Sequence, residues 1–101
     1  MDILEVFKAL SNPVRLTIVQ KLKEPKKHFP VADQLVDADQ EGVCVSIIQE
    51  TSGLSQSTVS SYLATLHRAG IIQSRRIGPW TYYKRNEENI QIFMKQLAEQ
   101  I

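Results

Sequence analysis

The sequence predicts a mainly α-helical fold that carries one small β-hairpin. The sequence predicts five helical stretches with recurring apolar residues, and one glycine, Gly53, separates two of them in the middle of the chain. Between Ile71 and Arg85 the pattern changes to an alternation rich in β-branched and aromatic residues, interrupted by Gly78 and Pro79. This alternation is typical of two strands joined by a tight turn, so the hairpin is expected there, with its tip near Ile77 to Trp80.

Length and composition indicate one ordinary globular domain. The chain has 101 residues, of which 43% are hydrophobic and 23% charged. A chain this short buries only roughly 60 to 65% of its unfolded surface, so a partner subunit would help to stabilise it. No apolar run approaches the roughly 20 residues of a membrane span, and the start of the chain is acidic where a signal peptide would be basic. We therefore expect a cytoplasmic protein with no membrane contact.

Two helices are expected at the N-terminus, and a loop after them. The first carries Ile3, Leu4, Val6, Phe7 and Leu10 at helical spacing. Asn12 and Pro13 then provide a cap and a first-turn proline for a second helix, which runs to about Lys23. Its inward residues are expected to be Val14, Leu16, Ile18, Val19 and Leu22. Residues 24–42 are expected to form a loop with one short helix around Val31 to Val36.

The middle of the chain predicts two helices joined by a sharp turn. The stretch VCVSIIQETSG, from Val43, is expected to be a short helix that Gly53 ends. Ser55 is a good cap for the next helix, which Gly70 ends. In that second helix Val59, Leu63 and Leu66 fall on one stripe. The side chains left outside are Gln56, Ser57, Ser60, Ser61, Ala64, Thr65 and Arg68.

A last helix is expected from Asn86, a capping residue that is followed by acidic residues in the first turn. Its apolar residues form a stripe made of Ile90, Phe93, Met94, Leu97 and Ile101.

The charge is distributed unevenly, although the net charge is only +1. From Thr51 to Asn86 there is no Asp or Glu, while the rest of the chain has seven basic residues against eleven acidic ones. The basic residues of the acid-free stretch are Arg68, Arg75, Arg76, Lys84 and Arg85. This asymmetry indicates one basic face that meets a polyanion, although a solvated charge cluster would look the same.

The helix, turn, helix and basic hairpin occur in the order of a winged helix-turn-helix. A helix that enters the major groove needs short side chains with donors and acceptors, and no carboxylates that repel phosphates. We therefore expect double-stranded DNA as the partner. The residues expected to read bases are Gln56, Ser57, Ser60, Ser61 and Thr65. Those expected to contact phosphates are Ser55, Thr58, Arg68, Arg75, Arg76, Lys84 and Arg85.

The same residues allow interpretations that assign the protein to other functional classes. The second helix of the pair could be a surface helix that happens to be rich in serine. A winged helix can also serve as a protein-interaction module, for which an apolar or acidic face would be expected instead. Catalysis is not expected, because GLSQS lacks the second glycine and the preceding strand of a nucleophile elbow, and no other catalytic motif occurs.

Three stretches together resemble the bacterial ArsR/SmtB family of transcriptional regulators: FKALSNPVRLTIVQKL, LSQSTVSSYLATLHRAGII and SRRIGPWTYYK. The resemblance implies an α-α-α-α-β-β-α order, a homodimer formed through the first and last helices, and repression at a near-palindromic operator. The dimer residues it implies are Ile3, Leu4, Phe7, Ile90, Phe93, Met94 and Leu97. The alternative is that both apolar stripes only complete one small core.

On this reading, residues 1–101 form a single winged helix-turn-helix DNA-binding domain. Residues 1–23 and 86–101 supply the dimerisation helices, 24–42 the loop, 43–69 the helix-turn-helix and 71–85 the wing.

The metal sites of that family are not expected in this chain, and no cofactor is expected. Where the soft-metal type has two cysteines one residue apart, this chain has Cys44 and then Ser46, and a hydroxyl is a poor ligand for a soft metal. The last helix contains neither His nor Asp for the second type of site. Cys44 is a possible redox switch, but it is more simply a small buried hydrophobe. The sequence names no small-molecule inducer.

Overall fold

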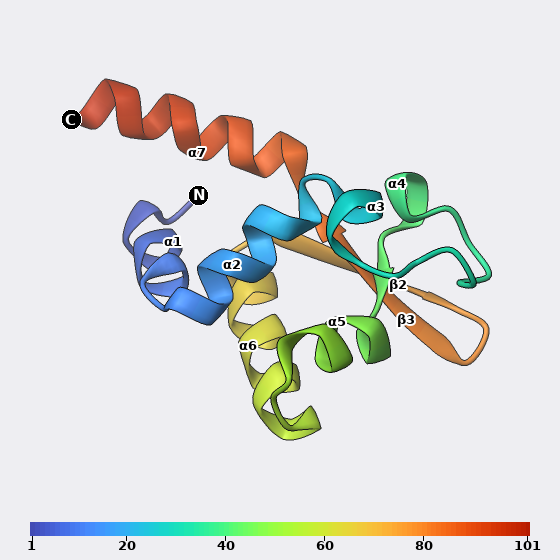
Figure 1. Ribbon diagram of the computed structural model, residues 1–101. Coiled ribbons are helices and arrows are strands. Elements are labelled where there is room, and N and C mark those ends of the chain that lie inside the picture. The colour runs from blue at the N-terminus through green and yellow to red at the C-terminus, as the bar shows by residue number, and fades with distance from the viewer.

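Helices α1 (Ile3–Leu10) and α2 (Pro13–Leu22) begin at side chains that cap them, in the computed structural model that describes residues 1–101 (Figure 1). The carboxylate of Asp2 accepts hydrogen bonds from the amides of Leu4 and Glu5, at 3.1 and 3.2 Å. The side chain of Asn12 does the same for the first turn of α2, where Pro13 needs no hydrogen-bond partner for its nitrogen. Both predicted helices are confirmed.

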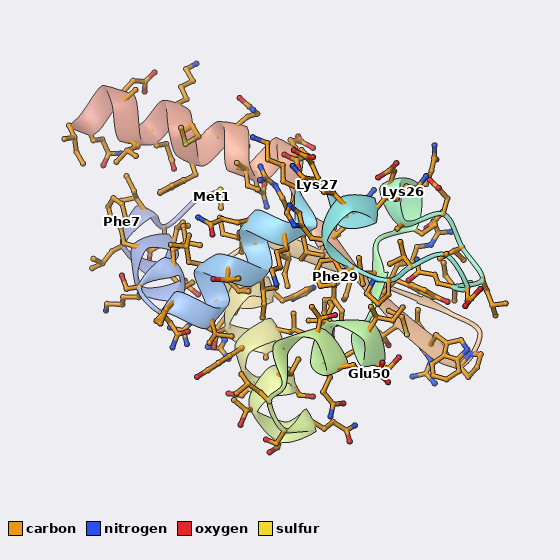
Figure 2. The ribbon with its side chains drawn as sticks, viewed as in Figure 1. Met1, Phe7, Lys26, Lys27, Phe29 and Glu50 are labelled. Atoms are coloured by element: carbon orange, nitrogen blue, oxygen red, sulfur yellow. The ribbon has the colours of Figure 1, made fainter.

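Residues 24–42 contain two one-turn helices, α3 (Pro25–His28) and α4 (Ala38–Glu41). The helix predicted around Val31 to Val36 is wrong, since that stretch forms turns and bends. Helices form on either side of it because Pro25 favours a first helical turn and Asp37 caps α4 by accepting from the amide of Gln40. The ammonium of Lys26, which projects from α3 toward α4 (Figure 2), lies 2.6 Å from Asp37, and this hydrogen bond lowers the pKa of the Asp37 carboxyl.

A strand that the sequence did not predict precedes the helix-turn-helix. Val43 and Cys44 form strand β1 (Val43–Cys44), and helix α5 (Val45–Ser52) begins after it, so the prediction of a helix from Val43 is wrong by two residues. These two residues pair antiparallel with Tyr83 and Tyr82. The pairing partner lies about 40 residues away, and a nearby apolar pattern cannot reveal it.

The remaining elements follow the predicted order. Gly53 adopts a left-handed conformation with φ of 70° and leads into α6 (Gln56–Arg68), after which β2 (Ile72–Ile77) and β3 (Trp80–Arg85) form the hairpin. Ile77 pairs with Trp80 across the turn, and the sheet order is β1-β3-β2. Asn86 caps the last helix, α7 (Glu87–Gln100). The predicted winged helix-turn-helix is therefore confirmed, with two short helices and one short strand added.

One core lies between the helices and the inner face of the sheet. The largest fully buried side chains in it are Val6, Val43, Ile48, Val59, Leu63, Leu66, Ile71 and Ile72. Ile18, Val19 and Leu22 of α2 are buried as predicted, but Leu16 is 39% exposed and its predicted inward position is wrong. Leu16 lies about 200° around the helix from Ile18, so one of the two must face solvent.

Helix α7 runs along the edge of the molecule and packs on α1 (Figure 1). The rings of Phe7 and Phe93 meet edge to face with centroids 5.7 Å apart. None of the helices is both long enough and apolar enough to cross a bilayer.

Gly42 should be far less replaceable than Gly53, although both have a positive φ. A Cβ at Gly42 would lie 2.3 Å from the carbonyl oxygen of Tyr83, whereas a Cβ at Gly53 meets nothing within 4 Å. We expect Gly53→Ala to cost about 1 kcal/mol, from its backbone conformation alone. We expect Gly42→Ala to cost more than about 2 kcal/mol, because the clash adds to the backbone strain of a φ of 99°. Urea unfolding of both variants measures this, and equal costs would contradict the packing of β1 against β3.

Candidate nucleic-acid interface

The outer face of α6 carries short polar side chains and no carboxylate. Gln56, Ser57, Ser60 and Ser61 are exposed, while the inner stripe of Val59, Leu63 and Leu66 is at most 1% exposed. This stripe fixes which side of the helix faces solvent. The four exposed residues therefore share one side of α6, whose first turns lie at the lower end of the view in Figure 1.

Side chains at the start of α6 form hydrogen bonds with nearby groups of the same turn. The hydroxyl of Ser55 accepts from the amide of Thr58 at 3.3 Å and donates to the Thr58 hydroxyl at 2.9 Å. Thr65, further along the helix, donates its hydroxyl to the carbonyl of Ser61 at 3.1 Å. Thr65 is half-buried and keeps only acceptor capacity toward the outside, so it is the least available of the five residues expected to read bases.

The cations of the wing point to opposite faces of the hairpin. Arg76 pairs with Thr81 and Arg75 with Tyr82, and neighbouring positions of a strand alternate between the two faces. Tyr83, on the same face as Arg76, packs against the core, whereas Arg75 lies on the other face together with Tyr82, which is only 2% exposed. Burial raises the pKa of the Tyr83 hydroxyl, so it stays neutral at physiological pH. The sequence analysis did not distinguish Arg75 from Arg76, whereas the fold places them on opposite faces of the hairpin.

Carboxylates from outside the acid-free stretch reach part of the wing. The guanidinium of Arg75 lies 2.7 Å from the carboxylate of Glu41 at the end of α4, and the ammonium of Lys84 donates to the carbonyl of Gln40 at 2.9 Å. Arg85, at the base of the hairpin, pairs through Nε and Nη2 with Glu87 at 2.9 Å, and its side chain is only 14% exposed. These three cations have intramolecular partners.

Arg68 and Arg76 remain without a carboxylate within 4 Å. Both are exposed, Arg68 at the end of α6 and Arg76 near the hairpin turn, where its Nε donates to the carbonyl of Gly78 at 3.3 Å. They carry the uncompensated positive charge of the acid-free stretch.

Three residues that the sequence analysis did not single out hold this surface in place. Arg15 donates to the carbonyls of Ala9 and Lys8 at the end of α1 and lies 5.3 Å from the centre of the Tyr62 ring, so it ties α1 and α2 to α6. Gln34 bonds the carbonyls of Val36 and Gly42 and the amide of Cys44, which fixes the approach to β1. Glu41 holds Arg75. Each is a single polar residue with a distant partner, and no local pattern marks it.

The residues expected at a dimer contact divide into two groups. Phe93 is buried in this chain, and Ile3, Ile90 and Leu97 are half-buried against the core. Leu4, Phe7 and Met94 are exposed, Leu4 by 57% and Met94 by 54%. The apolar stripes of α1 and α7 therefore contribute to the core on one side and leave apolar surface on the other.

Cys44 is 6% exposed, and its Sγ lies 3.3 Å from the hydroxyl of Ser46. No three His, Cys, Asp or Glu side chains come together in a geometry that could hold a metal ion. His28 and His67 are both exposed.

Proteins of similar sequence are transcriptional regulators with a helix-turn-helix. The IclR helix-turn-helix domain family matches residues 34–76. The uncharacterised HTH-type transcriptional regulator YbzH of Bacillus subtilis is 53% identical over 90 residues, which cover 89% of each chain. An arsenic resistance transcriptional regulator of Pseudomonas putida is 39% identical over 54 residues, 54% of this chain and 42% of that protein.

Solved structures give the same fold. The homodimeric winged helix-turn-helix DNA-binding domain of a possible ArsR-family regulator from Mycobacterium bovis is 27% identical, with a TM-score of 0.63 over 94% of this chain and 75% of that one. An ArsR-like regulator from Rhodococcus is 18% identical, with a TM-score of 0.70 over 96% of this chain and 76% of that one. These relatives are transcriptional regulators and not enzymes. With its exposed polar helix, its wing and these relatives, the chain belongs to the ArsR-type winged helix-turn-helix transcriptional regulators.

Proposed function

We propose that this DNA-binding regulator is a repressor that occupies a near-palindromic operator as a homodimer. The α6 helices of the two subunits would enter successive major grooves, about one helical turn of DNA apart. The observation that carries the proposal is the outer face of α6, which is exposed and free of carboxylates, together with Arg68 at the end of that helix and Arg76 on the wing, neither of which forms an ion pair. Gln56, Ser57, Ser60 and Ser61 would read bases, with Thr65 as an acceptor only.

Phosphate contacts would come first from Arg68 and Arg76. Arg75 and Lys84 would join them only after leaving Glu41 and the carbonyl of Gln40, and Arg85 would mainly hold the wing to α7. Ser55 and Thr58 would add hydroxyl contacts at the start of α6.

The homodimer is supported by exposed apolar side chains on α1 and α7 of a small domain, and by the homodimeric relative from Mycobacterium bovis. Leu4, Phe7 and Met94 would meet the partner, while Phe93 would support them from within the subunit. We propose that the protein acts in the cytoplasm, without the usual metal sites of its family. Burial of Cys44 against β3 favours a packing role for that thiol over a redox role.

Selection of binding sites from random duplexes by the purified protein tests this function. The proposal expects an enriched sequence with two inverted half-sites whose centres lie about 34–36 Å apart along the DNA. Enrichment of a single unrepeated half-site would contradict the dimeric repressor, and no enrichment at all would contradict sequence-specific binding.

Loss of Arg76 should affect the salt dependence of DNA binding more than loss of Arg75. Each phosphate contact contributes about −0.9 to the slope of log affinity against log salt, so Arg76→Ala should make the slope of a dimer less steep by about 2. Arg75→Ala should change the slope less, because Glu41 already neutralises that guanidinium. Fluorescence anisotropy at several salt concentrations measures both.

Glu41→Gln is the matched variant that breaks the Arg75–Glu41 ion pair from the other side. It frees Arg75 and should tighten binding to all duplexes by up to about fivefold per site, since an exposed ion pair is worth about 0.2–1 kcal/mol. Weaker binding by Glu41→Gln would mean that Glu41 orients Arg75 toward phosphate instead of withholding it.

Substitutions on the outer face of α6 should change sequence preference and leave the salt slope alone. Gln56→Ala and Ser60→Ala remove side chains that donate and accept but carry no charge. We expect a loss of about 1 kcal/mol or more on the selected operator, little change on random DNA and no change in the urea midpoint, because neither side chain packs in the core. Equal losses on operator and random DNA would contradict base readout.

A negative charge on the exposed side of α7 should separate the subunits. Met94→Glu places a carboxylate on the proposed dimer surface without touching the core, so the variant should sediment as a monomer at concentrations where the parent is a dimer. Leu35→Glu is the control, because Leu35 is exposed on the loop between α3 and α4. If both variants keep the oligomeric state of the parent, this surface is not the subunit contact.

A further inference from the structure

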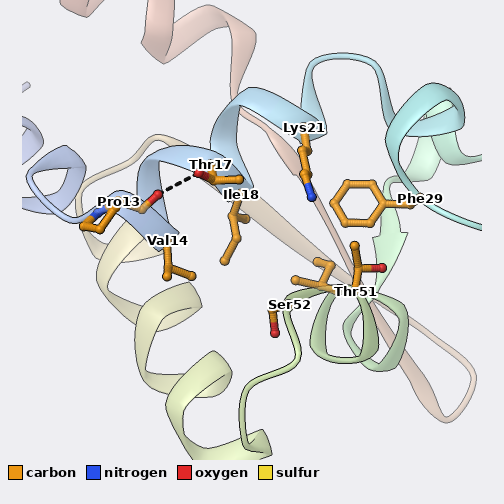
Figure 3. Close-up of a pocket in the computed structure, with 9 residues that line it drawn as sticks. Pro13, Val14, Thr17, Ile18, Lys21, Phe29, Thr51 and Ser52 are labelled. Carbon is orange, nitrogen blue, oxygen red and sulfur yellow. Dashed lines mark hydrogen bonds between the residues drawn. The ribbon is translucent and has the colours of Figure 1, made fainter.

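We propose that the cavity between α2 and α5 is a binding site for a small organic anion with an apolar body. The cavity has a volume of about 260 Å³ and opens between the two helices, with Phe29 closing one end (Figure 3). Its apolar walls come from Pro13, Val14, Ile18, Phe29 and Ile48. The site lies away from the outer face of α6 and from the apolar surface of α1 and α7.

The charge at the cavity is positive and uncompensated. Lys21 of α2 lines the cavity and is half-buried, and its ammonium group points toward the same space as the ring of Phe29 in Figure 3. No carboxylate lies within 4 Å of Lys21, and Glu24 in the following turn is 4.0 Å from Lys27 instead. A half-buried ammonium beside apolar walls favours an anionic group with an apolar remainder.

Two hydroxyl groups that line the cavity donate hydrogen bonds within the protein, and a third does not. Thr17 donates to the carbonyl of Pro13 at 2.7 Å, and Ser52 donates to the carbonyl of Gln49 at 2.8 Å. Thr51, on the last turn of α5, makes no hydrogen bond to the other residues of the cavity (Figure 3). Lys21 and Thr51 thus supply donors from the two helices, which suits the two oxygens of one carboxylate.

The volume limits the occupant. Sites for drug-sized ligands are about 300–1,000 Å³, so this cavity suits a smaller molecule, with one aromatic ring or a short branched chain. The class that matches size, walls and charge is a small aromatic or branched aliphatic monocarboxylate.

An occupant would act on the helix-turn-helix directly. Helix α5 is its first helix and joins α6 through Gly53 and Leu54, and Ile48 belongs both to the cavity wall and to the core beneath α6. A molecule wedged between α2 and α5 therefore changes how α6 is supported. This regulatory consequence rests on the proposed function, whereas occupancy of the cavity does not.

Fluorine NMR with 4-fluorobenzoate tests occupancy without DNA. We expect binding by the parent protein, and at least tenfold weaker binding of the neutral 4-fluorobenzamide. Lys21→Met keeps the length of the side chain without its charge and should weaken 4-fluorobenzoate binding at least tenfold. Lys23→Met, an exposed lysine at the end of the same helix, is the matched control and should bind as the parent does.

A second variant tests the location. Thr51 is exposed at the mouth of the cavity, so Thr51→Trp should fold normally and block entry, which abolishes binding. The proposal is overturned if 4-fluorobenzoate does not bind at about 10 mM, if the amide or Lys21→Met binds equally well, or if Thr51→Trp binds unchanged. Fluorescence anisotropy with the selected operator tests the regulatory consequence separately. If 4-fluorobenzoate binds but leaves the operator affinity unchanged, only the regulatory consequence is overturned. If the parent protein without 4-fluorobenzoate does not bind the operator, the proposed repressor function is overturned instead.

Discussion

Burial of the inner stripe of α6 is the interaction on which the rest of this protein depends. Val59, Leu63 and Leu66 are almost completely removed from solvent. Each such side chain contributes about 1.5–3 kcal/mol, and the whole stability of a small domain is about 5–15 kcal/mol. Rotation of α6 about its axis would lose a large part of that total. The helix can therefore present short, weakly packing residues on its exposed side, because its orientation is set from the opposite side.

The segment before the helix-turn-helix tunes the charge that this surface offers. Residues 24–42 bring Glu41 to Arg75 and Gln40 to Lys84, on the face of the wing that also carries the buried Tyr82. The uncompensated cations are then Arg68 and Arg76. In the proposed function, phosphate would compete with Glu41 for Arg75, so the loop would set how strongly the wing holds DNA of any sequence, while α6 would set which sequence it holds.

The small size of the domain explains both the apolar surface on α1 and α7 and the cavity between α2 and α5. A chain of 101 residues cannot cover every apolar side chain with its own atoms, and Leu4 and Met94 are left exposed. In the same way, α2 and α5 meet without filling the space between them, because Phe29, from the end of α3, closes only one end of it. One unfilled surface suits a second subunit and the other suits a small molecule.

Local signals in the sequence determined the helices, their caps, the hairpin and the polar face of α6. Asp2, Asn12, Ser55 and Asn86 are capping residues whose partners lie within three positions, and the stripe of α6 follows from helical periodicity alone. Tertiary structure alone decided the features that join distant residues: β1 against β3, the start of α5, the exposure of Leu16 and the pairing of Glu41 with Arg75. The physical reason is range, since a cap or a periodic stripe is complete within a few turns, whereas an ion pair spanning 34 positions exists only once the chain has folded.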